Sequence, residues 1–171
     1  MKLNTSRFGE IEVNEEEIIT FSDGLFGFED IKKYIIFQME DDNPLMWMQS
    51  IEEGSLAFIL IRPFEFNPNY SLQLSDNDVE ELGLTSPDDS DIFGIVVVPE
   101  DPSKMTANLQ GPVVINRVLK KGKQALSNLE RVEKQQDIMK DIYMDSFKGK
   151  ILDDITRYQV VEKGIIDDNK L

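Results

Sequence analysis

The sequence predicts a mostly β protein, either an antiparallel barrel or a sandwich, with one short helix over residues 75–82 and one long C-terminal helix from about residue 124 to 147. Short β-branched and aromatic runs recur through the first two thirds of the chain, separated by Gly, Pro and acidic turns. This spacing is typical of antiparallel sheets. A length of 171 residues fits a single domain spanning residues 1–171.

The expected strands follow one another at short intervals. A first hairpin turns through Gly9, and Glu52-Glu53-Gly54 is the expected loop of a later one. Between them, Ser22-Asp23-Gly24-Leu25-Phe26-Gly27-Phe28 predicts a structured turn with three apolar anchors. Strands are expected at residues 2–7, 11–13, 18–21, 34–38, 45–51, 56–61, 92–98 and 112–118.

Two segments carry helix signals instead. Ser75 can cap a two-turn helix that ends at Gly83, with Val79 and Leu82 facing the core. In the second segment, apolar residues recur at three- and four-residue steps, which predicts the long helix. Its apolar positions are Leu126, Leu129, Val132, Met139, Tyr143 and Phe147.

Composition excludes several classes of chemistry. The chain has no Cys and no His, which removes disulfides, thiolate nucleophiles and the usual zinc ligands and general bases. Its formal charge is −15, and residues 1–110 alone carry 6 basic and 23 acidic side chains. We therefore expect no direct binding to nucleic acid or to an anionic membrane, and favour a basic protein partner. Without a signal peptide or an apolar run long enough to span a bilayer, the expected location is cytoplasmic.

No motif assembles a catalytic, cofactor or metal site. The acidic clusters Glu40-Asp41-Asp42-Asn43 and Asp88-Asp89-Ser90-Asp91 lack the alternating ligands of an EF-hand and are interpreted as solvated turns. Gly24-Leu25-Phe26-Gly27-Phe28 lacks the Lys-Ser/Thr of a phosphate-binding loop. Lys120-Lys121-Gly122-Lys123 is interpreted as a solvated basic hairpin tip. The sequence thus predicts no catalytic residues, no cofactor and no metal, and a protein that is not an enzyme.

Met46, Trp47 and Met48 are consecutive large residues on one expected strand. Neighbouring strand residues face opposite sides, so one side is a candidate for an exposed partner surface. For Trp47 itself we favour a place in the core.

Seven blocks of the sequence form a recognisable series, at residues 6–13, 18–30, 47–50, 56–58, 63–64, 74–84 and 98–116. In this order and spacing they resemble the FliW family of flagellar assembly factors over about residues 5–124, and the block at 98–116 is especially close. The resemblance implies a β-barrel-like fold. In the C-terminal part the pattern departs, because residues 125–149 look like a helical insertion before a delayed closing strand.

The resemblance implies a partner-switching regulator in the cytoplasm. Such a protein binds flagellin and, when free, binds the RNA-binding translational repressor CsrA and relieves repression of flagellin synthesis. The resemblance favours an allosteric antagonism of CsrA. The alternatives are a dedicated flagellin export chaperone without a translational role, and, from another class, a carboxylate- or metal-dependent enzyme. The predicted 124–147 helix could also mediate self-association.

Overall fold

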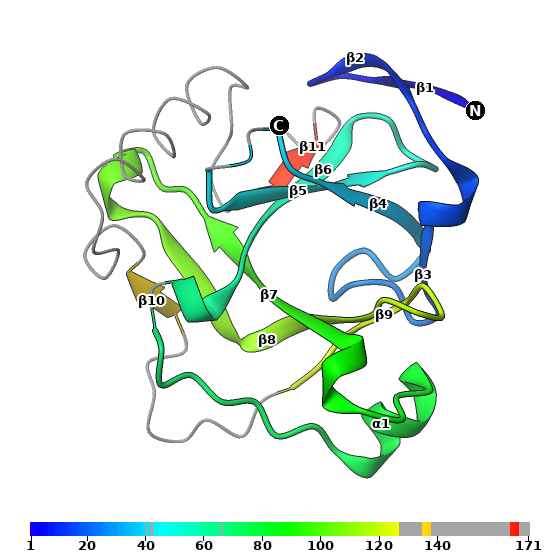
Figure 1. Cartoon of the computed structure of the whole chain (residues 1–171). Coiled ribbons are helices and arrows are strands. Elements are labelled where there is room, and N and C mark those ends of the chain that lie inside the picture. Colours follow the sequence, from blue (N-terminus) through cyan, green and yellow to red (C-terminus); the bar gives the residue numbers. More distant parts are fainter. Residues whose placement is uncertain (40, 42, 66, 127–134, 138–164, 168–171) are drawn as a thin grey trace.

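The computed structural model describes residues 1–39, 41, 43–65, 67–126, 135–137 and 165–167 (Figure 1). Its one α-helix within those ranges is α1 (Asp76–Leu82). Single 3₁₀ turns lie at Glu15–Glu17, Pro63–Glu65, Pro87–Asp89 and Pro102–Lys104. The strands are β1 (Lys2–Thr5), β2 (Gly9–Glu12), β3 (Ile19–Phe21), β4 (Lys33–Phe37), β5 (Leu45–Ser50), β6 (Leu56–Ile61), β7 (Ser90–Val97), β8 (Thr106–Asn116), β9 (Lys121–Gln124), β10 (Gln135–Asp137) and β11 (Ile165–Asp167).

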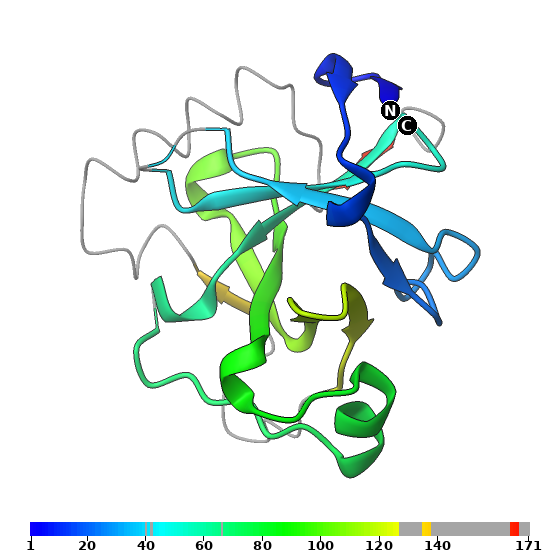
Figure 2. The ribbon, with the colours of Figure 1, turned by 45° about the vertical axis from the view of Figure 1, so that its right-hand side comes forward.

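A closed barrel of seven strands forms the body of the protein. Strands β3 to β9 each pair antiparallel with the next strand along the chain. The ring closes because β9 also pairs in parallel with β3, with Thr20 opposite Lys121. This closure decides between the barrel and the sandwich in favour of the barrel. The β1–β2 hairpin is a separate two-stranded sheet that stands at the opposite end of the molecule from α1 (Figures 1 and 2).

Strands β5 and β6 are buried on both faces. On one face, Met48 and Phe58 pack with Phe21 and Tyr34 in a cluster that draws on strands β3 to β8. On the other face, Trp47 belongs to a second cluster that also includes loop residues, among them Tyr70 and Met105. Two cores in a chain of this size explain why alternation is absent from these strands: every position of β6 is buried.

The expected placement of Trp47 in the core is confirmed, since its side chain is fully buried. Its indole packs edge to face with Phe8, ring centroids 5.2 Å apart. The expectation of an exposed face on this strand is wrong, because Met48 on the opposite side is buried too. The β1–β2 hairpin supplies Phe8 to cover this face of β5, a tertiary contact that no local pattern indicates.

Helix α1 forms as its end signals predict. The Ser75 hydroxyl accepts a hydrogen bond from the Asp78 amide, and the Asp78 carboxylate accepts one from the Ser75 amide, which is a capping box. Gly83 ends the helix with φ 66°. Leu82 is buried as expected, but Val79 is partly exposed rather than core. Its buried apolar contact is made by the last turn, where Leu82 packs against Val114 and Ala125.

Strand β9 was not predicted as a strand. Lys121–Gln124 is not part of a hairpin tip but strand β9, and the tip is the preceding turn, where Lys120 has φ 55°. Two lysines and a glycine in four residues have low intrinsic β-propensity, so the local sequence does not indicate a strand. Tertiary pairing with β3 and β8 imposes it.

Most of the predicted helix at 124–147 and of the insertion at 125–149 lies outside the described residues and stays a prediction, as does the delayed closing strand. Among the described positions in that range, Gln124 and Gln135–Asp137 lie in strands. Gln124 ends β9, and β10 pairs antiparallel with β8, Gln135 opposite Asn108. Further along, β11 pairs antiparallel with β6 over Leu56–Phe58.

Candidate partner surface at the α1 end

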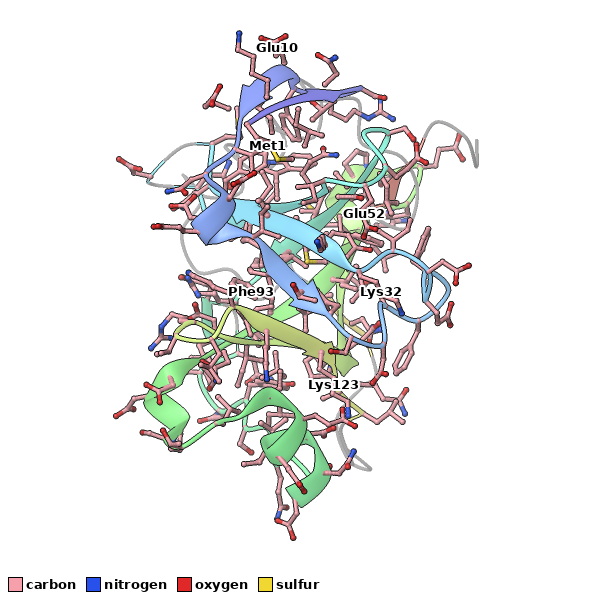
Figure 3. All side chains as sticks on the ribbon, turned by 90° about the vertical axis from the view of Figure 1, so that its right-hand side faces the viewer. Met1, Glu10, Lys32, Glu52, Phe93 and Lys123 are labelled. Carbon is pink, nitrogen blue, oxygen red and sulfur yellow. The ribbon has the colours of Figure 1, made fainter. Side chains whose placement is uncertain are left out.

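A network of three charged side chains ties α1 to the barrel. The ammonium of Lys123 on β9, which is labelled in Figure 3, lies 2.7 Å from an Asp78 carboxylate oxygen and 2.5 Å from one of Glu81. The side chains of Lys123 and Asp78 are mostly buried, whereas that of Glu81 is half exposed. Asp78 and Glu81 are three residues apart and therefore project from one side of the helix. The network fixes the helix against the closing strand.

The three pKa values are shifted together. Burial alone would raise the pKa of the Asp78 carboxyl, but hydrogen bonds from Lys123 and Ser75 outweigh it and hold that pKa below its ordinary value. The hydrogen bond from Lys123 likewise lowers the pKa of Glu81. Burial would lower the pKa of Lys123, but its hydrogen bonds to the two carboxylates raise it. All three groups are therefore charged at neutral pH.

We expect Lys123→Met to destabilise the protein by about 2 kcal/mol near pH 7, because it leaves the buried Asp78 carboxylate without its cation. The lowered carboxyl pKa values stabilise the fold above about pH 4 and lose that effect as pH falls through them. Chemical denaturation at pH 7 and at pH 3 should therefore show a smaller acid-induced loss of stability in the variant than in the parent. Lys121→Met, an exposed position on the same strand, is the matched control. If the stability of Lys123→Met and of Lys121→Met depended on pH in the same way, the stabilising role of the Lys123–Asp78 ion pair would be contradicted.

Exposed apolar side chains gather around this network. We define the α1-end surface as Phe26, Val79, Val118, Leu119 and Leu126, each between 36% and 69% exposed. Phe26 and Leu126 line one hollow together with Asp78 and Lys123. Leu119 lies against Gly83 at the end of α1. An apolar centre with a polar rim is the usual composition of a protein–protein interface.

The turn at residues 22–28 holds part of this surface in place. Leu25 is buried as an anchor, and the Phe26 amide donates a hydrogen bond to the Gln124 side chain, 2.9 Å away. Phe28 is a second anchor and packs edge to face on Phe58. Phe26, the third expected anchor, instead points outward and is 55% exposed. All three were predicted as anchors, because hydrophobicity alone does not show which side chain of a turn points into solvent.

Arginine side chains pair with the acidic cluster at residues 88–91. Asp91 forms ion pairs with Arg117 at 2.9 Å and with Arg62 at 3.6 Å, and Arg117 also donates to the Asp88 carbonyl oxygen. In the cluster at residues 40–43, only Asp41 and Asn43 are described. Among the described residues, no three carboxylates converge as metal ligands would. The described parts also contain no helix long and apolar enough to cross a membrane.

Fold and surface together define a small acidic β-barrel with exposed apolar side chains at its α1 end. The family model for the FliW protein matches residues 2–138, and the chain belongs to this family. The flagellar assembly factor FliW of Alkaliphilus metalliredigens is 44% identical over 143 residues, covering 83% of this chain and 88% of that protein. That of Caldicellulosiruptor saccharolyticus is 46% identical over 124 residues, covering 72% and 81%. A crystal structure of the flagellar assembly factor FliW superimposes with a TM-score of 0.75 at 33% identity, covering 81% of this chain and 96% of the other.

Proposed function

We propose that this protein is a cytoplasmic, non-enzymatic flagellar assembly factor that binds flagellin and, when free, binds a CsrA-type RNA-binding repressor and relieves repression of flagellin synthesis. Membership of the FliW family, whose relatives carry the name flagellar assembly factor, is the observation that carries this proposal. The acidic body supports it, because an RNA-binding repressor must present basic residues to phosphate. The antagonism is proposed to be allosteric, at a site away from the RNA-binding surface.

Association with the repressor should be electrostatically steered, because residues 1–110 carry a formal charge of −17. We expect the association rate constant to fall steeply as salt rises through the physiological range, where screening acts over about 8 Å. Stopped-flow mixing at several ionic strengths measures the association rate constant. Sucrose solutions of matched viscosity are the control for the effect of viscosity on diffusion. An association rate independent of salt would overturn the steering.

The α1-end surface can be tested separately. We expect Phe26→Ser and Val118→Ser to keep the melting temperature and to weaken capture of the repressor or of flagellin, since exposed apolar residues at an interface centre carry much of the affinity. Phe64→Ser, 50% exposed but set on the 3₁₀ turn after β6, is the control. Capture of flagellin with no capture of the repressor, at low and high salt, would favour the dedicated export chaperone instead.

A further inference from the structure

Strand β4 is paired along only part of one edge. Strand β3 pairs with it at Lys33 and Tyr34 and then ends, because the chain turns away through Asn14 and the 3₁₀ turn at Glu15–Glu17. On its other edge β4 pairs with β5 as far as Phe37. Among the described residues, no strand pairs with the β3-side edge of β4 beyond Tyr34.

Along β4, successive residues direct their N–H and C=O groups alternately towards β5 and towards the β3 side, so some of these groups face the open edge. The carbonyl of Lys33 accepts from Ile51 on the β5 side, and that of Lys32 accepts from Phe21 on the β3 side. Continuing this alternation, Ile36 lies opposite Met48 with its N–H and C=O turned away from β5. An unpaired donor and acceptor at a sheet edge are a template for another extended chain.

A groove lies along this edge. The β1–β2 hairpin and the segment after it form one wall, with Ile11 and Val13, and β4 forms the other, with Ile36 and Phe37. Figure 3 shows the hairpin standing above the barrel, with Met1 and Glu10 on it. The groove has a volume of about 420 Å³, within the range of peptide- and ligand-binding sites. The hairpin is held in place by Phe8, whose ring packs on Phe37 at 5.0 Å.

The rim of the groove is predominantly acidic. Glu12 and Glu17 line it, Glu15 and Glu16 adjoin it, and Arg7 is the cation among its lining residues. The Glu12 side chain is 71% exposed and accepts from the chain's own N-terminal ammonium at 3.2 Å, so it already binds one cation. A second copy of this chain is disfavoured as occupant, because both copies would carry a charge of −15.

We propose that this groove is a β-augmentation site for an extended partner segment in which apolar and basic residues alternate. The segment pairs with the N–H and C=O of Ile36, seats its apolar side chains against Ile11 and Phe37, and turns its basic side chains to Glu12 and Glu17. This site lies at the opposite end of the molecule from the α1-end surface (Figures 1 and 3). It does not depend on the proposed function.

The probe is a labelled, acetylated and amidated peptide of alternating Lys and Val, titrated with the full chain by fluorescence anisotropy at low and physiological salt. We expect saturable, salt-sensitive binding, with amide chemical-shift changes at Ile36 and Ile11 in the labelled protein. The same peptide N-methylated on every backbone amide, which leaves no N–H to donate to a strand edge, should not bind. Absence of binding by the unmethylated peptide, or equal binding by both, would overturn the proposal.

Two variants separate the backbone and charge contributions. Ile36→Pro removes the edge N–H without touching the β5 ladder, as proline does on edge strands, and should abolish binding. Glu12→Lys with Glu17→Lys should weaken binding about tenfold, since it replaces two exposed ion pairs at the rim with like-charge contacts. Asp76→Lys with Glu80→Lys on α1 makes the same charge change at the other end and should leave binding within about twofold of the parent. Equal weakening by both pairs would mean nonspecific attraction, and a concentration-dependent dimer lost in Ile36→Pro would make a second copy the occupant; either result overturns the proposal.

Discussion

Trp47→Ala is expected to lower the free energy of unfolding by about 3–5 kcal/mol, the range measured for removing a large aromatic side chain from a core. Trp47 is fully buried at the centre of β5 and joins the barrel to the β1–β2 hairpin through Phe8. The cavity would open in the buried cluster that Trp47 shares with side chains of β5 to β8 and with Tyr70 and Met105, whose close packing limits how far they can move to fill it. Urea denaturation followed by circular dichroism gives the change in free energy.

Trp47→Phe is the matched control and should lose less, because it keeps an aromatic ring against Phe8. Met46→Ala, at a partly buried position next to Trp47, should also cost less than Trp47→Ala. If Trp47→Ala kept its melting temperature and lost a partner instead, Trp47 would belong to an interface in spite of its burial. The same variant also reports on the groove, since the hairpin that forms one wall rests on this side chain through Phe8.

Local sequence signals predict most of this barrel because most of its strands form from β-rich runs bounded by turn residues. The cap of α1 illustrates this: Ser75, Asp78 and Gly83 act within one short segment, so their roles are visible without knowledge of the fold. The incorrect predictions concern residues whose structure is set by contacts distant in the sequence. Residues of β9 have weak strand propensity, and only pairing with β3 and β8 makes them a strand.

The candidate surfaces were less accessible to prediction for the same reason. Lys123 was one of four residues in an expected solvated tip, yet it pairs with Asp78, 45 positions earlier in the chain. Phe26 and Leu126 lie in one hollow although 100 positions separate them. Charge and hydrophobicity predicted that an acidic protein surface would bind a partner. They could not say which apolar residues the closed barrel would leave outside.

Gly122→Ala is expected to destabilise the protein by about 3 kcal/mol, the upper part of the usual range for overpacking a core. A Cβ built at Gly122 would lie 2.5 Å from the Phe21 ring, much closer than carbon atoms approach in proteins. The ring has little room to retreat, because Phe21 is fully buried and packs edge to face on Tyr34 at 5.3 Å. Gly122 and Phe21 are also the register partners of the parallel β3–β9 pairing that closes the barrel. The added methyl group would therefore push apart the two strands at the closure.

A double-mutant cycle with Phe21→Leu tests this cause directly. Phe21→Leu alone should destabilise by leaving a cavity, but in its background Gly122→Ala should cost much less than in the parent, because the methyl group then has space. A coupling free energy of about 1–2 kcal/mol in this direction would show that the glycine is required by the aromatic ring behind it. Strict additivity would instead attribute the cost of Gly122→Ala to the backbone of β9. In that case the closure would depend on the flexibility of this strand rather than on the fit between Gly122 and Phe21.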